Sequence, residues 1–85
     1  MMGHMALINE FQEVDGPTQR RHGPVTCGYR TFVVEGEVLL QLDTYGSAER
    51  QIPDKISQSI QLNVEGAREL MSLLVEVFPE LDRGA

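Results

Sequence analysis

Apolar and polar residues alternate along most of positions 37–45, which is the pattern of a β-strand with one face turned to a core. Val38, Leu40 and Leu42 alternate with Glu37, Gln41, Asp43 and Tyr45. Successive side chains of a strand point to opposite faces of its sheet. We therefore expect the apolar side to be buried and the polar side to be open to a partner.

Two further strands are predicted around this one. Residues 25–34 are rich in β-formers, and Glu35-Gly36 interrupts them before residue 37, so the two segments form a hairpin. Residues 56–62 alternate again, with Ile60 and Leu62 expected inward and Ser59 and Gln61 outward. Residues 7–14 do not alternate cleanly and fit either a fourth strand or a short irregular arm.

A helix is predicted from Asn63 to Phe78. Asn63 is a good N-cap, Glu65 places a carboxylate in the first turn, where the helix dipole favours it, and Pro79 ends the segment. The polar residues of this helix fall on one narrow stripe. The remaining apolar arc is wider than the roughly 100° that packing on one sheet requires.

The surplus apolar surface of this helix predicts a second subunit. A chain of 85 residues offers no further helix to cover that surface, and two-fold dimers are the commonest assembly. The residues expected in the interface are Leu70, Leu73, Leu74 and Val77. The alternative is that apolar residues such as Leu73 stay partly exposed, as single residues often do on protein surfaces.

The chain is expected to be a single α+β domain, in which a small antiparallel sheet of three or four strands precedes one C-terminal amphipathic helix that makes the dimer. Residues 1–5 read like a cloning remnant, which leaves 6–85 as the domain. No stretch is long enough to cross a membrane, and no secretory signal is seen. The lone Cys27 cannot form an internal disulfide, which fits a cytoplasmic location.

Charge is distributed unevenly along the chain. A net charge of −6 argues against a general polyanion binder, because phosphate contacts require Lys and Arg. From Arg20 to Gln61, however, five basic residues balance five acidic ones, and the acidic excess lies at the two ends. Two predicted loops in this neutral region, 16–24 and 45–55, carry basic residues. We expect one neutral-to-basic face and one acidic face.

No catalytic site can be assembled from these residues. The chain has no Gly-x-Gly-x-x-Gly motif and no P-loop spacing. Cys27 has the phase of Val25 and Val33, which favours a small core residue over a nucleophile, and a lone loop histidine such as His22 is usually solvated. With one Cys and no close carboxylate cluster, no metal site is expected. We therefore expect neither enzymatic activity nor a cofactor.

The sequence supports a binding surface better than a catalytic site. Proteins that hold single-stranded nucleic acid need aromatic faces on which bases stack and cations along the phosphate track. The residues that supply a sparse version of both are Arg20, Arg21, Arg30, Tyr45, Arg50 and Lys55. Tyr29 shares the phase of Val25 and Val33 and fits a core position as well as an exposed one. A solvated face with incidental charges is the competing interpretation.

The order of these segments resembles the positive-cofactor-four family of transcriptional coactivators, whose fold is shared with the plant Whirly proteins. The matching segments are the strand 38–45, a loop with Pro53 and Lys55, the strand 59–62, and Glu65 with the helix that carries Leu70. The resemblance covers about residues 29–78. It implies a dimer built through the helices and a sheet face that holds single-stranded nucleic acid. The chain departs from the family pattern in its single Lys, its negative charge, and Gly66, where the family usually has an aromatic residue.

The segment 42–62 is also similar to short bacterial proteins catalogued as methionyl-tRNA-formyltransferase-like. Formyl transfer needs a folate-binding domain several times this length with catalytic Asn, His and Asp, so the enzymatic meaning is set aside. The sequence thus predicts a small dimeric single-stranded nucleic-acid-binding module, of the kind found in transcription-coactivator-like regulators. The alternative is an acidic protein–protein interaction module, which the acidic ends, the wide apolar helix and the shortage of Lys favour.

Overall fold

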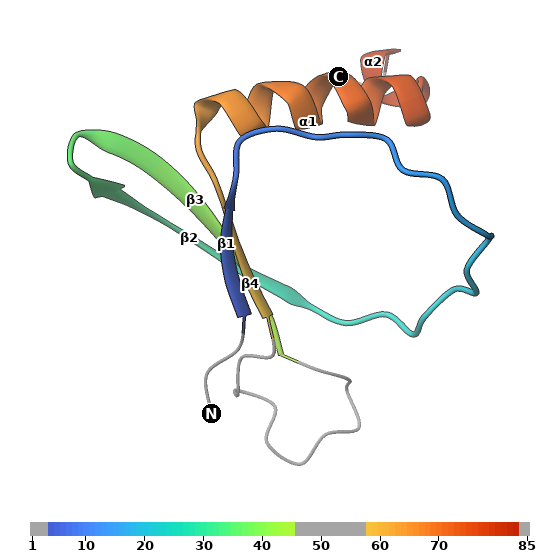
Figure 1. Cartoon of the computed structure of the whole chain (residues 1–85), viewed down its shortest axis with the longest axis horizontal. Coiled ribbons are helices and arrows are strands. Elements are labelled where there is room, and N and C mark those ends of the chain that lie inside the picture. Colours follow the sequence, from blue (N-terminus) through green and yellow to red (C-terminus); the bar gives the residue numbers. More distant parts are fainter. Residues whose placement is uncertain (1–3, 46–57, 84–85) are drawn as a thin grey trace.

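A four-stranded sheet, one long helix and one short helix make up the fold (Figure 1). The computed structural model describes residues 4–45 and 58–83. The elements, in chain order, are β1 (His4–Ile8), β2 (Cys27–Val34), β3 (Glu37–Thr44), β4 (Gln58–Leu62), α1 (Val64–Val77) and α2 (Glu80–Arg83). The predicted α+β class, with the sheet ahead of a C-terminal helix, is confirmed.

The strands β2 and β3 form the predicted hairpin. Val34 pairs with Glu37 at its closed end. The two connecting residues, Glu35 and Gly36, have φ angles of 53° and 82°. Two consecutive positive φ values are typical of a type I′ turn, whose twist matches that of the flanking strands. Gly36 adopts this conformation without a Cβ clash, whereas Glu35 does so at a steric cost.

The sheet order is β1-β4-β3-β2, and the sheet is mixed instead of purely antiparallel. β3 pairs antiparallel with both of its neighbours, but β1 lies parallel to β4, from His4↔Gln58 to Ile8↔Leu62. The structure divides the segment 7–14, because the strand ends at Ile8 and an irregular arm follows. The backbone amide of Phe11 in this arm donates to Oε1 of Glu69 in α1 at 3.1 Å, so the arm follows the helix and leaves the sheet.

β1 begins inside the segment 1–5 that was set aside as a remnant. His4 pairs with Gln58 and Met5 pairs with Ser59, so both residues extend the sheet.

The helix α1 has the ends that the sequence predicts. Asn63 is the N-cap, and its Oδ1 accepts a hydrogen bond from the amide of Gly66 at 3.0 Å. Phe78 is the C-cap, and its amide donates to the carbonyl of Leu74 at 2.8 Å. Pro79 has no amide hydrogen with which to continue the helix. The short helix α2 follows and was not predicted from the sequence.

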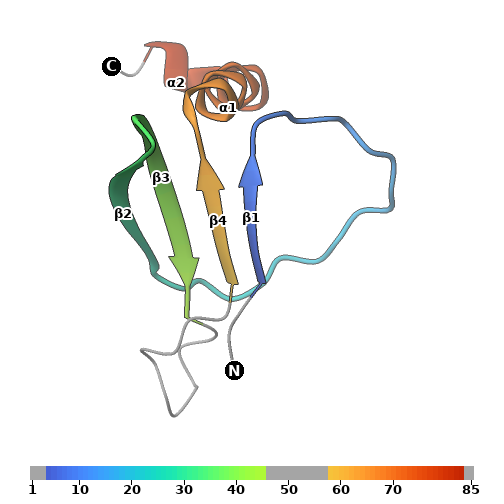
Figure 2. The same ribbon diagram turned by 60° about the vertical axis from the view of Figure 1, so that its left-hand side comes forward.

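Two views show that α1 crosses one end of the sheet and extends away from the β2–β3 hairpin (Figures 1 and 2). Its first turn rests on the end of β1. Gly66 is buried there, and a Cβ atom at this position would overlap the carbonyl oxygen of Ile8. The cap at Asn63 and this close approach together set the direction in which α1 leaves the sheet.

Burial in the sheet does not follow the expected division into a buried apolar side and an open polar side. Among the described residues, Leu39 and Leu62 are the only buried hydrophobic side chains. The buried polar residues are Gln41, Asp43, Ser59 and Asn63. Val38, which was expected to be buried, is 64% exposed. The alternation is therefore correct, but the polar side holds a buried network. The apolar side is buried at Leu62, partly buried at Leu40, Leu42 and Ile60, and exposed toward the hairpin.

Candidate functional site

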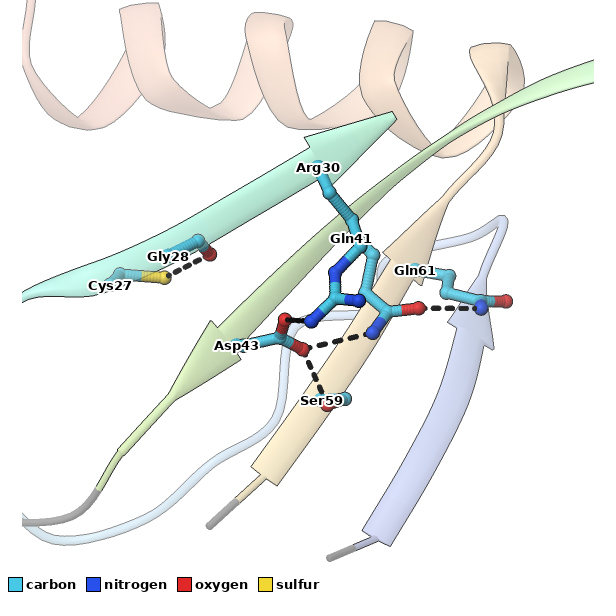
Figure 3. Close-up of polar contacts among 7 residues, drawn as sticks. All are labelled: Cys27, Gly28, Arg30, Gln41, Asp43, Ser59 and Gln61. Atoms are coloured by element: carbon cyan, nitrogen blue, oxygen red, sulfur yellow. Dashed lines mark hydrogen bonds and ion pairs between the residues drawn. The ribbon is translucent and has the colours of Figure 1, made fainter. Parts of the chain in front are cut away.

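Five polar side chains from three strands gather on one side of the sheet (Figure 3). The strand register pairs Arg30 with Gln41, Gln41 with Gln61 and Asp43 with Ser59, so all five point to the same side. We call this side the polar face, and its members are Arg30, Gln41, Asp43, Ser59 and Gln61. The opposite side, the apolar face, carries Tyr29, Val33, Val38, Leu40, Leu42 and Ile60.

Asp43 is the centre of the polar face and is only 1% exposed. Its Oδ1 accepts hydrogen bonds from the Ser59 hydroxyl at 2.6 Å and from Nε2 of Gln41 at 2.9 Å. Its Oδ2 accepts a bond from Nη2 of Arg30 at 2.8 Å, which also makes an ion pair. The bonds from Ser59 and Gln41, together with the bond and charge of Arg30, outweigh the cost of burial and lower the pKa of Asp43 from its ordinary value of 3.8.

The polar network continues across the sheet through two amides. Nε2 of Gln61 donates to Oε1 of Gln41 at 3.0 Å, and Gln41 in turn donates to Asp43. Each buried side-chain nitrogen and oxygen in the described residues has a hydrogen-bond partner. Fully paired polar groups of this kind fix the positions of one another's side chains. The polar face is therefore an ordered surface.

Arg30 is the one cation on the polar face, and its side chain is 55% exposed. Only Nη2 of its guanidinium makes a hydrogen bond within the described residues. The other N–H groups of the fork stay available to a ligand, because a guanidinium carries five donors in a fixed plane. Asp43 thus holds Arg30 in place and offsets part of its charge.

Two aromatic residues share this side of the sheet with Arg30. A Cβ atom built on Gly28 would lie 2.7 Å from the Tyr45 hydroxyl oxygen and 3.1 Å from its Cε2, so the Tyr45 ring lies over Gly28. Gly28 pairs with Asp43, and Phe32 pairs with Leu39, which places both rings on the side of the polar face. Tyr45 and Phe32 are each partly exposed.

The structure brings together only part of the predicted nucleic-acid-binding set. Arg30 and Tyr45 lie on the same side of the sheet. Arg20 and Arg21 are exposed in the arm between β1 and β2, which runs outside the sheet (Figure 1). Arg50 and Lys55 lie outside the described residues.

The four predicted interface residues are all on α1 and remain accessible to varying degrees. Leu73 and Leu74 are each 38% exposed and Val77 is 56% exposed, while Leu70 is partly buried. Met71, which was not among them, is 69% exposed. The arc of accessible apolar residues is thus as wide as the sequence indicates.

A groove lies between the arm and α1. Its volume is about 710 Å³, and it is lined by Phe11, Gln12, Glu13, Arg68, Glu69, Ser72, Leu73, Glu76 and Val77. Three carboxylates and one guanidinium make this lining acidic. The hydrogen bond between Phe11 and Glu69 connects its two walls.

Cys27 was expected in the core, and that expectation is wrong because Cys27 is exposed. Tyr29 is 76% exposed, so the core position considered for it is wrong as well. Both residues follow the strand alternation, but they lie on β2, where the apolar face is exposed in the single chain. No group of three or more His, Cys, Asp or Glu residues that could hold a metal ion occurs in residues 4–45 and 58–83. No helix in those ranges is long and apolar enough to cross a membrane.

Sequence reasoning missed the residues that organise the polar face. Gln41, Asp43, Ser59 and Gln61 were interpreted as outward residues of separate strands. The signal that they interact was present, because they occupy alternate positions of two strands and include complementary donors and acceptors. Finding it required the strand register, which places Asp43 opposite Ser59.

Comparisons of the chain with protein-family models, with curated proteins and with solved structures return no match.

Proposed function

We propose that the polar face binds single-stranded nucleic acid and that the protein is a small homodimer. The observation that carries this proposal is the placement of Arg30, Phe32 and Tyr45 on one sheet face, beside the partly exposed amide of Gln61. Aromatic rings, a guanidinium and amide groups on a sheet face are the side chains that single-strand binders use for stacking and hydrogen bonding.

Each group on this face has a distinct task in the proposed complex. The Tyr45 ring packs against Gly28 through its hydroxyl end, and its remaining surface stacks on a base. Because the ring is already packed, less side-chain entropy is lost on stacking. The free donors of Arg30 bind a phosphate or a base edge, and the amide of Gln61, at the end of the network, hydrogen-bonds to a base.

Electrostatics makes a smaller contribution here than in Lys-rich binders. Asp43 offsets part of the Arg30 charge, and Arg20 and Arg21 supply further cations from the arm. With so few phosphate contacts, we expect log K to fall with log salt by roughly 0.7 for each phosphate contacted, for a total slope of about −1 to −3. Base stacking then provides most of the affinity.

Fluorescence anisotropy with a labelled single strand of about 20 nucleotides, at low and near-physiological salt, tests the proposal. Tyr45→Leu should weaken binding roughly tenfold, because base–aromatic stacking contributes about 1–3 kcal/mol. Phe11→Leu is the control, since it removes an aromatic ring from the arm, outside both sides of the sheet. If the wild-type protein does not bind at low salt, or if both variants lose affinity equally, the polar face is not the binding surface.

A second pair of variants isolates the cation. Arg30→Gln removes the charge of the polar face, while Arg68→Gln removes one from the exposed surface of α1. We expect only Arg30→Gln to weaken binding. It should also make the dependence of log K on log salt less steep by about 0.7, which corresponds to one phosphate contact. An equal effect of both substitutions would indicate non-specific attraction.

The resemblance to transcriptional coactivators supports the same function and points to a role in transcription regulation. The exposed, unpaired Cys27 fits a reducing compartment, and we propose the cytoplasm as the site of action.

The acidic groove between the arm and α1 favours a second candidate, a protein-interaction module. Glu13, Glu69 and Glu76 line that groove together with the apolar Phe11, Leu73 and Val77. This combination suits a basic, partly apolar peptide. Weakened capture of such a peptide by Glu76→Gln, with no nucleic-acid binding by the wild-type protein, would support this alternative. Recovery of the protein alone in a pull-down would count against it.

A further inference from the structure

Two large apolar surfaces of this chain are uncovered. On the sheet, Tyr29, Val33 and Val38 are 76%, 64% and 64% exposed, and the β2 and β3 positions on the apolar face include no charged residue. On the helix, the exposed apolar residues are Met71, Leu73, Leu74, Val75, Val77 and Phe78. Contiguous apolar surfaces of this kind mark an interface.

Helix α1 cannot fold back over the sheet of its own chain without disrupting its first turn. The Asn63 cap fixes the first turn, and Gly66 sits against the Ile8 carbonyl. From there α1 extends away from the β2–β3 hairpin, where Val33 and Val38 lie (Figure 1). The exposed end of the apolar face and the apolar residues of α1 therefore lie apart within one chain.

The chain exposes more surface than a compact monomer of its mass, by an amount comparable to one side of a standard-size interface. A folded monomer of 9.5 kDa is expected to expose about 5,000 Å². This chain exposes 7669 Å², which is roughly 2,600 Å² more. Counting every residue outside the described ranges as fully solvated removes about 1,800 Å² from that excess. The remainder, about 800 Å², includes the surface of the exposed arm 9–26 and is of the order of the area that each partner buries in a standard interface.

We infer that α1 of a second copy packs against the apolar face of β2, β3 and β4, and that the contact is repeated around a two-fold axis. The two surfaces match, since both are aliphatic and uncharged and each chain carries one of each. The acidic residues Glu65, Glu69 and Glu76 lie on the polar stripe of α1 and stay in water. This inference specifies the interface of the proposed dimer and does not depend on nucleic-acid binding.

Two valines next to the hairpin turn provide a matched test. Val38 belongs to the apolar face and is 64% exposed, while Val34 pairs with Glu37 on the opposite face and is 45% exposed. Val38→Asp should raise the dimer Kd roughly tenfold or more, because the partner helix would bury an unpaired carboxylate. Val34→Asp should leave the dimer unchanged. Sedimentation equilibrium of the full chain measures both, with circular dichroism to verify that each variant is folded.

Cross-linking between two differently tagged chains gives a second measurement that does not depend on a destabilising charge. One chain carries Val38→Cys and the other carries Leu74→Cys, both with Cys27→Ala, and the chains are unfolded and refolded together before oxidation. We expect a mixed disulfide-linked dimer, which places α1 of one copy against the sheet of the other. A monomeric wild-type protein, or cross-links between Leu74→Cys chains alone, would overturn the inference. If the wild-type protein is a dimer by sedimentation but binds no nucleic acid, that result counts against the proposed function and leaves this interface intact.

Discussion

Gly66 lies against the carbonyl oxygen of Ile8, so that the first turn of α1 and the last residue of β1 are in direct backbone contact. No other residue type fits there, because any Cβ would overlap this oxygen. The contact joins two elements that are far apart in sequence and sets the direction of α1. It also accounts for a glycine in the first turn of a helix, where glycine is otherwise unfavourable.

Gly66→Ala should destabilise the protein by about 2 kcal/mol, because an overlap with main-chain atoms can be relieved only by moving α1 or β1. At an ordinary helix position the same change stabilises by up to about 1 kcal/mol. Urea unfolding at a fixed protein concentration measures the effect. Gly16→Ala is the control, since no atom lies within 4 Å of its added Cβ. Equal stability of the two variants would show that this backbone contact is not tight.

The stability of the fold should fall in acid through Asp43. Because its pKa in the folded state is lowered from 3.8, the stabilisation from the ionised carboxylate is complete above that value. It is lost as the pH falls from 3.8 through the lowered folded value. Ser59→Ala removes the hydrogen bond that lowers this pKa most, and it should cost about 1–2 kcal/mol at pH 7 and less as the pH falls below 3.8.

Ser72→Ala on the exposed side of α1 provides the matched control for Ser59. It should alter stability by less than about 0.5 kcal/mol at either pH. A pH-independent effect of Ser59→Ala would mean that the Ser59 hydroxyl does not act through the charge of Asp43.

Glu35→Asn should stabilise the hairpin by about 0.5–1 kcal/mol. The residue has a φ of 53°, and Asn followed by Gly is the preferred pair for a turn with two positive φ values. Thermal unfolding measures the change, and Glu37→Asn, in the adjacent strand, should give no gain. Destabilisation by Glu35→Asn would argue for a favourable contact of the Glu35 side chain.

Gly28→Ala should displace the Tyr45 ring, since the added methyl group would lie 2.7 Å from its hydroxyl oxygen. A side chain can rotate away more easily than a backbone, so we expect a loss of only about 1 kcal/mol. The ring resonances of Tyr45 should shift in NMR spectra, and affinity for a single strand should fall as it does in Tyr45→Leu. Gly23→Ala, with no atom within 4 Å of its Cβ, should change neither.

Local patterns predicted the elements well. The Asn63 cap, the Phe78 end of α1 and the Glu35-Gly36 turn all follow from residue preferences that act over a few positions. Polar and apolar residues of β3 and β4 also alternate as expected. These features depend on short-range sterics and hydrogen bonds, which a sequence records directly.

The sequence alone determined the strands of the hairpin, β4, the helix α1 and the width of the apolar arc on α1. Only the tertiary structure decided which side of the sheet is buried and that β1 joins β4 in parallel. Alternation shows that two sides differ, but the choice between them depends on what covers each side. Here Asp43 accepts hydrogen bonds from Arg30, Gln41 and Ser59 and so forms a buried network across the strands. These contacts depend on how the strands pair, which the local sequence pattern does not specify.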